Sequence, residues 1–273
     1  MLRIFAAVFF VLAFFPIPVF PQVNLEVMKV TTVTEQGFSL FIQRKGQTIL
    51  FDTGKPDKFN HDVKRLGVDL SNVDIVVISH THFDHAGGLL FFLELNKKAT
   101  VYLSKNAQND LEFRDFILKI CEDYPGRIQF IDESTEIAKD TYIISGIKRN
   151  ELSLDYVDHE IILVSKINNG LALFTGCGHS GIMSIIGTAR RMFPNLVIKA
   201  VFGGFHLYGL SFEAEDAAKT KTFVEMIGKQ MLASPILRIY TGHCTGVKPY
   251  QILKGICGSR MEYWAYGSTF FVF

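Results

Sequence analysis

Seven residues, SHTHFDH at positions 79–85, constrain this chain more than any other stretch of its sequence. They hold three of its eight histidines together with one aspartate. Imidazole and carboxylate groups are ligands of zinc and also of iron or manganese, and a cluster of them is costly to leave unpaired. We therefore interpret the segment as a metal site, in preference to a set of histidines bonded only to their neighbours.

The apolar run 73–79 before this cluster predicts a buried strand that ends at the motif. If strand geometry continues, His80 and His82 point to one side and bind one ion. Asp84 and His85 follow where the chain turns into a helix, within reach of a second ion. Two adjacent divalent ions can hold a hydroxide for attack at neutral pH and polarise a carbonyl or phosphoryl oxygen.

The rest of the chain predicts an α/β fold. Its 273 residues are 48% hydrophobic, which is enough for a full core. Residues 28–54 predict a meander of antiparallel strands, and residues 56–66 and 105–121 predict helices. Later strands and helices alternate, and three strands end in glycine-rich turns bearing His179, His206 or His243. Because ligands gather at the carboxyl ends of strands in layered α/β folds, these turns are expected to converge on the motif.

The N-terminus predicts export. Arg3 precedes an apolar run from Ile4 to Phe15, and prolines follow. The run is shorter than the roughly 20 residues that a spanning helix needs. We interpret residues 1–21 as a cleaved signal, with an uncleaved anchor as the alternative, and residues 22–273 as one domain that is periplasmic or secreted.

Charge and cysteine content narrow the class of partner. The net charge of +1, without a run of like charges, gives no footprint for nucleic acid or an anionic membrane, so a small-molecule substrate is expected. Four cysteines are too few for a disulfide scaffold, and the sequence does not decide whether any pair oxidises. It does not predict an oligomeric state.

The motifs resemble the metallo-β-lactamase superfamily. HTHFDH matches its His-x-His-x-Asp-His signature, and FDTG at 51–54 matches the aspartate that precedes it. EQGFSLFI, ILFDTG, SHTHFDHAGGL, SGIKR, FTGCGHSGI, VFGGFHL and GHCTG resemble, in that order, the branch named for a dihydropterin synthase of methanopterin biosynthesis, over residues 28–250. The resemblance implies a four-layer αββα sandwich with the metals at one edge of the two sheets.

The resemblance also implies ligands for each ion. They are His80, His82 and His179 for the first ion, and Asp84, His85 and His243 for the second. A GH-x-P-G segment of the family is missing here, so His159 is kept as a reserve ligand should His179 fail. Cys177 replaces the family's bridging aspartate; we favour ligation by its thiolate, while a neutral thiol that only packs stays open.

Other residues are given roles around the metals. Asp84 and His206 are the candidate catalytic groups, with His206 binding substrate, stabilising charge or donating a proton. Asp52 is expected to orient a ligand histidine. The candidate anion-binding groups are Thr245, Gly246, Lys248, Lys148 and Arg149.

The ligand set favours a metal-dependent hydrolase of a phosphoester or other ester-like small substrate, with one or two divalent ions, zinc first. The first alternative is a transferase that joins a pterin to an aminobenzene ribosyl phosphate, as the branch name implies. The second is a non-catalytic domain that holds metal, which the missing aspartate keeps open.

Overall fold

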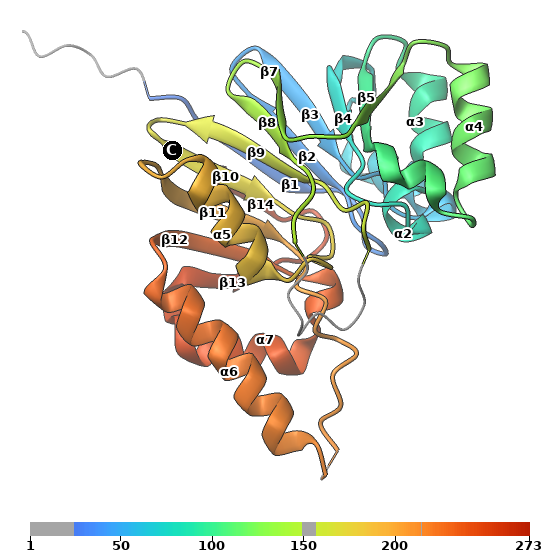
Figure 1. Ribbon diagram of the computed structural model, residues 1–273. Coiled ribbons are helices and arrows are strands. Elements are labelled where there is room, and N and C mark those ends of the chain that lie inside the picture. The colour runs from blue at the N-terminus through green and yellow to red at the C-terminus, as the bar shows by residue number, and fades with distance from the viewer. Residues whose placement is uncertain (1–24, 149–156, 214) are drawn as a thin grey trace, which may run out of the picture.

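The computed structural model describes residues 25–148, 157–213 and 215–273, and within them the strands form two seven-stranded sheets that lie face to face (Figure 1). The strands of the first sheet, in spatial order, are β14 (Thr269–Val272), β1 (Met28–Thr32), β2 (Leu40–Arg44), β3 (Gln47–Phe51), β4 (Ile75–Val77), β5 (Thr100–Ser104) and β6 (Ile128–Ile131). Those of the second are β13 (Met261–Tyr263), β12 (Ile236–Thr241), β11 (Val197–Gly203), β10 (Gly170–Phe174), β9 (Ile162–Ile167), β8 (Thr141–Ile144) and β7 (Thr135–Ala138).

Helices cover the outer face of each sheet (Figure 1). Those on the first sheet are α1 (Pro56–Leu66), α2 (Phe83–Ala86), α3 (Leu89–Leu95) and α4 (Arg114–Asp123). Those on the second are α5 (Ile182–Met192), α6 (Ala217–Ala233) and α7 (Val247–Cys257). Short 3₁₀ segments are η1 (Leu70–Asn72), η2 (Lys105–Asn109), η3 (His243–Thr245) and η4 (Gly258–Arg260).

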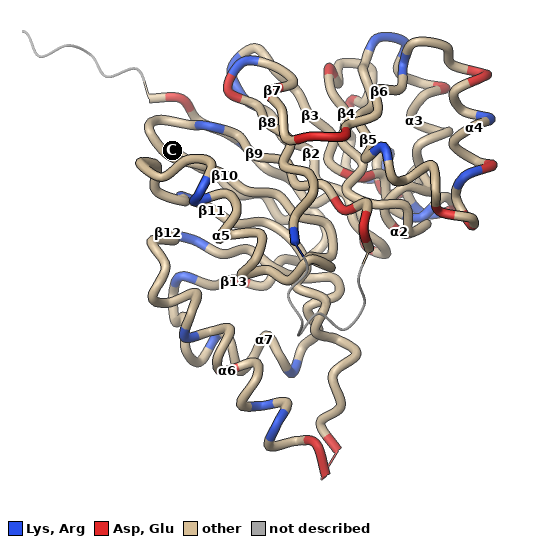
Figure 2. The backbone as a smooth tube through the Cα atoms, in the orientation of Figure 1, with Lys and Arg blue, Asp and Glu red and all other residues tan. Residues whose placement is uncertain are grey.

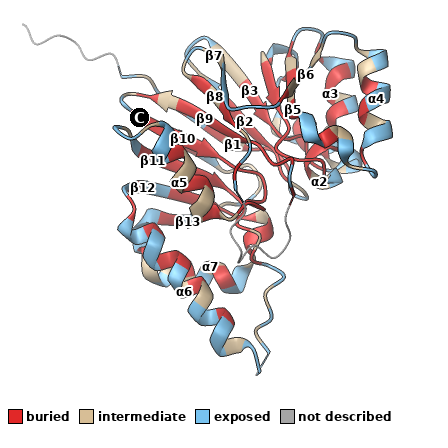
Figure 3. Cartoon of the chain, viewed as in Figure 1, coloured by how far each residue is buried: buried red, intermediate tan, exposed pale blue. Residues whose placement is uncertain are grey.

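Alternating side chains along the strands divide the core into three layers. In β3, Phe51 packs between the sheets, whereas Leu50 packs under the first group of helices. In β9, Leu163 packs between the sheets and Val164 packs under α5. Because successive strand residues point to opposite faces, runs that are apolar at every position can fill two layers at once. Figure 3 shows the result, with buried strands inside and helices exposed on their outer faces. The predicted four-layer αββα sandwich is confirmed.

Parallel strands in both sheets bring distant loops to one edge. β3, β4, β5 and β6 are parallel neighbours in the first sheet, and β10, β11, β12 and β13 are parallel in the second. The loops that follow β3, β4, β10, β11 and β12 therefore leave from the carboxyl ends of strands. The predicted meander at 28–54 and the helix at 56–66 are also confirmed.

The helix predicted over 105–121 is wrong as a single element. The chain forms η2, breaks at Asp110 and resumes as α4 at Arg114. Asp110 has extended backbone, and its carboxylate accepts the N–H of Glu112 at 3.0 Å. A short polar side chain that bonds its own backbone competes with the helix in this way. The apolar spacing from Phe113 onward still fits α4.

The surface carries both signs of charge. Figure 2 shows Lys and Arg interspersed with Asp and Glu along the outer helices and loops. Among the residues that the structure describes, none of the helices combines the length and apolar character needed to span a bilayer.

Buried Asn96 at the end of α3 fixes the chain that leads into β4. Its Nδ2 donates to the carbonyls of Leu70 (2.8 Å) and Val73 (2.9 Å). Its Oδ1 accepts the N–H groups of Lys98 (2.9 Å) and Ala99 (2.7 Å). One fully buried side chain thus bonds four backbone groups, of which the Leu70 carbonyl also accepts the N–H of Val73.

Asn96→Ala is expected to lower the free energy of unfolding by roughly 2–4 kcal/mol, since buried backbone groups would lose their partners. The measurement is a urea midpoint at unchanged m-value. Asn72→Ala, at an exposed position in the same loop, is the matched control and should change stability by less than about 0.5 kcal/mol. Equal effects of the two substitutions would contradict this account.

Candidate metal centre

The motif at 79–85 leaves the first sheet where β4 ends at Val77. The strand geometry does not continue through the histidines, so that detail of the prediction is wrong: His82 is already the N-cap of α2. The two imidazoles meet nevertheless, with His80 Nε2 and His82 Nδ1 3.1 Å apart. The turn into α2, and not strand alternation, brings them together.

His179 joins these two histidines from the second sheet. It lies in the loop between β10 and α5, and its ring centroid is 4.7 Å from that of His80 and 5.1 Å from that of His82. One ligand atom from each of the three lies within 4.8 Å of the others. The three residues form a group that could hold one ion, which we call the first ligand group.

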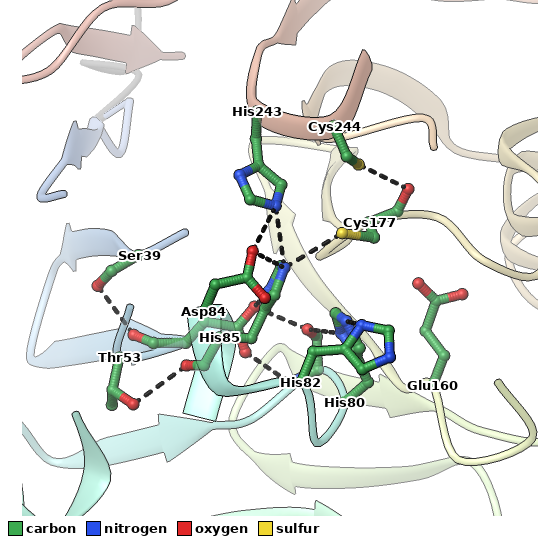
Figure 4. Close-up of polar contacts among 12 residues, drawn as sticks. Ser39, Thr53, His80, His82, Asp84, His85, Glu160, Cys177, His243 and Cys244 are labelled. Carbon is green, nitrogen blue, oxygen red and sulfur yellow. Dashed lines mark hydrogen bonds and ion pairs between the residues drawn. The ribbon is translucent and has the colours of Figure 1, made fainter. Parts of the chain in front are cut away.

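A second ligand group consists of Asp84, His85 and His243. The Nε2 atoms of His85 and His243 are 3.1 Å apart, and Asp84 Oδ2 lies 3.3 Å from His243 Nε2 (Figure 4). His243 comes from the end of β12, so residues far apart in sequence share this group. The His80 and His85 rings are 4.1 Å apart, which makes the two groups neighbours.

Cys177 lies between the two groups. Its Sγ is 3.1 Å from His85 Nε2, and it also belongs to a cluster with His80 and His85 (Figure 4). Burial raises the pKa of this thiol well above its usual value. A bound cation would favour the thiolate, because metal coordination deprotonates cysteine. The residue that stands in place of the family's aspartate thus lies beside a histidine of each ligand group.

Cys244 is a neighbour that the sequence prediction missed. It lies beside Cys177 and His243, and its Sγ contacts the Cys177 carbonyl at 3.4 Å. Burial alone would raise its pKa, but hydrogen bonds involving Cys177 and His206 lower it to about 7. Its position next to His243 was the only signal in the sequence. All four cysteines of the chain are free thiols.

Asp52, at the end of β3, fixes two ligand histidines on the side of their Nδ1 atoms. Its carboxylate accepts the backbone N–H and the hydroxyl of Ser79 at 2.6 and 2.7 Å, and it lies 2.7 Å from His85 Nδ1. Ser79 Oγ is 2.9 Å from His80 Nδ1. With both Nδ1 atoms engaged, each Nε2 is directed toward the ligand groups, as is typical of metal-binding histidines.

Burial also sets the charge of the ligands. It lowers the pKa of His80 and His85 well below the usual value, with neighbouring imidazoles adding to the effect. Partial burial alone would raise the pKa of Asp84, but the His243 hydrogen bond and the nearby His85 hold it well below its usual range. Burial raises the pKa of Asp52, against the Ser79 hydrogen bonds. Neutral imidazoles beside an ionised carboxylate are the forms that bind metal.

The spacing of the donors fits metal ions. In a tetrahedral zinc site with bonds of about 2.0–2.3 Å, ligand atoms lie about 3.3–3.8 Å apart. His80 Nε2 and His82 Nδ1 are 3.1 Å apart, about 0.2 Å below this range, and Asp84 Oδ2 and His243 Nε2 are 3.3 Å apart, at its lower end. Both the donor types and these separations are therefore compatible with divalent metal binding.

Three residues of the site have left-handed backbone. The φ angles are 61° for Asp52, 49° for His206 and 50° for His243. Such angles cost energy for residues other than glycine and persist where surrounding contacts impose them. The loop at Gly176 passes so close to Ser79 that only glycine fits, because a Cβ at position 176 would collide with Ser79 Oγ. The site is thus held by backbone placement as well as by side chains.

A cavity of about 340 Å³ opens onto the two groups. It is lined by His82, Asp84, Cys177, His206, Tyr208, His243 and Cys244. The ring of His206 packs at a tilt against that of His179, with centroids 4.2 Å apart, which places it beside the first ligand group. A small molecule in this cavity would contact residues of both groups.

Of the remaining predicted residues, those that the structure describes lie outside this cavity. Thr245 is buried, and its hydroxyl contacts the Phe205 N–H and the Thr241 hydroxyl, so it is engaged within the fold. Lys248 lines a neighbouring cavity, over the ring of Phe212. Lys148 is exposed, and Arg149 lies outside the described residues. His159 contacts Thr81 and belongs to neither ligand group.

Comparisons with known proteins agree with this geometry. The sequence model described as the metallo-beta-lactamase superfamily matches residues 32–167. An uncharacterized protein of Methanocaldococcus jannaschii is 31% identical over 65% of this chain and 75% of its own length. The same organism's 7,8-dihydropterin-6-methyl-4-(beta-D-ribofuranosyl)-aminobenzene-5'-phosphate synthase is 27% identical over 79% of this chain and 82% of its own.

A solved structure extends the likeness to almost the whole fold. Tm1679, a metal-dependent hydrolase of the beta-lactamase superfamily, superimposes with a TM-score of 0.66 at 26% identity. The match covers 89% of this chain and 98% of Tm1679. With the αββα layers and the histidine motif at the carboxyl end of β4, these findings show that the chain belongs to the metallo-β-lactamase superfamily.

Proposed function

We propose that the protein is a metal-dependent hydrolase of a phosphoester or other ester-like small molecule. The observation that supports it most directly is the pair of adjacent ligand groups opening onto one cavity. The likeness to Tm1679, itself a metal-dependent hydrolase, supports the same reaction class. The cavity of about 340 Å³ suits a small substrate or the reacting end of a larger one.

Each residue has a part in this proposal. The two ligand groups, together with Cys177, would hold the ions. When bound, divalent ions would activate water as a nucleophile and polarise the oxygen of the scissile group. Asp84 lines the cavity as well as the second group, so its carboxylate can orient the attacking water.

His206 is placed to act on the substrate itself. It lines the cavity, and its ring lies between those of His179 (4.2 Å) and Tyr208 (5.6 Å). From this position an imidazole can stabilise negative charge on the substrate or donate a proton to the leaving group. Removing it is expected to slow turnover while leaving both ligand groups intact.

A synthase-type reaction is the second candidate. The methanopterin-pathway synthase of Methanocaldococcus jannaschii shares 27% identity over most of both chains, and this likeness favours a related substrate. Identity at this level does not fix a substrate, and sites of one fold support different reactions. The candidates differ in whether one substrate or two are needed.

His80→Ala and Asp84→Ala are each expected to remove about one bound ion and to lower turnover by about 100-fold or more, because each deletes a ligand from a different group. His61→Ala is the control, since this side chain is 66% exposed and lies outside the ligand groups. Metal content of the purified protein and turnover on phosphatase and esterase panels provide the measurements. Unchanged turnover in both variants would refute the proposal.

The hydrolase is expected to turn over single phosphoester or ester substrates, with activity lost on chelation and restored by zinc. Product that forms only when a pterin and a ribosyl-aminobenzene phosphate are mixed would favour the synthase instead. Tight metal binding without turnover on either panel would indicate a metal-holding domain. Mass spectrometry of the products separates the three results.

We also propose that the protein is exported. This part of the proposal is supported only by the sequence of residues 1–21. Cleavage is expected to leave a mature N-terminus near Gln22 in an exported fraction. N-terminal sequencing of cell-associated and exported fractions checks it. Intact Met1 on protein found only in the cytosol would overturn the export prediction.

A further inference from the structure

A short segment just before β9 contacts both loops that supply the first ligand group. It consists of His159 and Glu160, which are both buried. One of these loops carries His80 and His82, and the other carries His179. We call His159 and Glu160 the clamp.

Glu160 fixes the loop of His179 through the backbone. Its Oε1 accepts the N–H groups of Gly178 (2.8 Å) and His179 (3.0 Å), and its Oε2 accepts that of Ser180 (2.8 Å). Three successive amides thus converge on one carboxylate that is only 3% exposed. A buried carboxylate needs such donors to offset its lost hydration, and charge-assisted bonds of this kind are strong. The loop therefore has little freedom to move His179.

His159 fixes the other loop through Thr81, which lies between the two ligand histidines. His159 Nε2 is 2.6 Å from Thr81 Oγ1, and the same hydroxyl bonds the carboxylate of Asp110. The next residue along the segment, Ile161, donates its N–H to the Ser79 carbonyl at 2.8 Å. The clamp thus runs alongside the motif as well as the His179 loop.

Neither clamp residue lies in a ligand group, so their effect on a metal must be indirect. The first ligand group draws its imidazoles from both sheets, and no covalent bond fixes the distance between the two loops. The clamp is one rigid element bonded to both. Residues that orient ligands in this way typically change metal affinity by about 10–100-fold when replaced.

We infer that Glu160 and His159 are positioning residues that hold the two loops at the spacing the first ion requires. The inference rests on the proposed metal centre. It assigns a function to a buried side chain, Glu160, that was not among the predicted site residues. It also explains why His159 lies close to the motif without being a ligand.

Glu160→Gln gives the sharpest test. Glutamine keeps the size of the side chain and one acceptor oxygen for Gly178 and His179, but its NH₂ group faces the N–H of Ser180, so one bond is replaced by two opposed donors. The dissociation constant of the first ion is expected to rise about 10–100-fold, and that of the second by less than about threefold. Glu133→Gln, at an exposed glutamate, is the matched control.

Zinc and cobalt(II) titrations of the full chain measure this effect without relying on activity. His82→Ala and His243→Ala provide references for the loss of the first and the second ion. Glu160→Gln should still bind the first ion, but at a higher metal concentration than wild type, and its visible cobalt spectrum should change in the bands that His82→Ala removes. A urea midpoint near that of wild type would exclude general unfolding as the cause.

Thr81→Val is the second variant, and it applies if Glu160→Gln does not fold. Valine has nearly the same shape as threonine but lacks the hydroxyl that contacts His159. This variant should also lower the affinity for the first ion selectively. Wild-type affinity for both ions in each folded variant would overturn the inference while leaving the proposed function intact. Wild-type protein that binds no metal would overturn both.

Discussion

The site depends on one buried carboxylate. Asp52 is completely buried at the end of β3, where an unpaired charge would be strongly unfavourable. Ser79 supplies it with two hydrogen bonds and His85 with a third. These bonds link neighbouring strands and fix two imidazole rings by their Nδ1 sides, directly for His85 and through the Ser79 hydroxyl for His80. Metal-binding geometry is therefore built into the packing of the first sheet before any ion enters.

The second sheet must then be brought to the same point. The shared apolar layer between the sheets, in which Phe51 packs near Phe174, keeps the ends of β3 and β10 together. Local polar bonds complete the alignment: Gly176 allows its loop to reach Ser79, and Glu160 holds the amides that follow. Apolar packing thus brings the loops of the two sheets near each other, and directional hydrogen bonds fix their final positions. Hydrogen bonds are needed for this alignment, because apolar contacts alone are not directional.

Much of the site could be predicted because its ligands lie close together in sequence or at the ends of recognisable strands. The cluster at 79–85 is local, and the turns with His179 and His243 follow strands with clear apolar patterns. Ser79, Cys244 and Glu160 could not be found in this way, since their roles depend on contacts between loops that no periodicity encodes. Strand β14 is similar: it pairs with β1, the strand farthest from it in the sequence, a contact that only the folded structure reveals. The break at Asp110 was missed because a local side-chain bond outweighed apolar spacing.

Cys177 determines what kind of ion the proposed centre would prefer. A carboxylate at this position would suit hard cations such as manganese and magnesium, whereas a thiolate is a soft ligand that favours zinc or iron. Burial raises the pKa of the free thiol, so a weakly binding ion would not displace its proton at neutral pH. A strong metal–sulfur bond, such as a Zn–S bond of about 2.3 Å, would offset the cost of deprotonating the buried thiol. A thiolate from Cys177 in place of the family's aspartate would therefore favour zinc or iron in the proposed centre, and imidazole is a ligand that both metals accept.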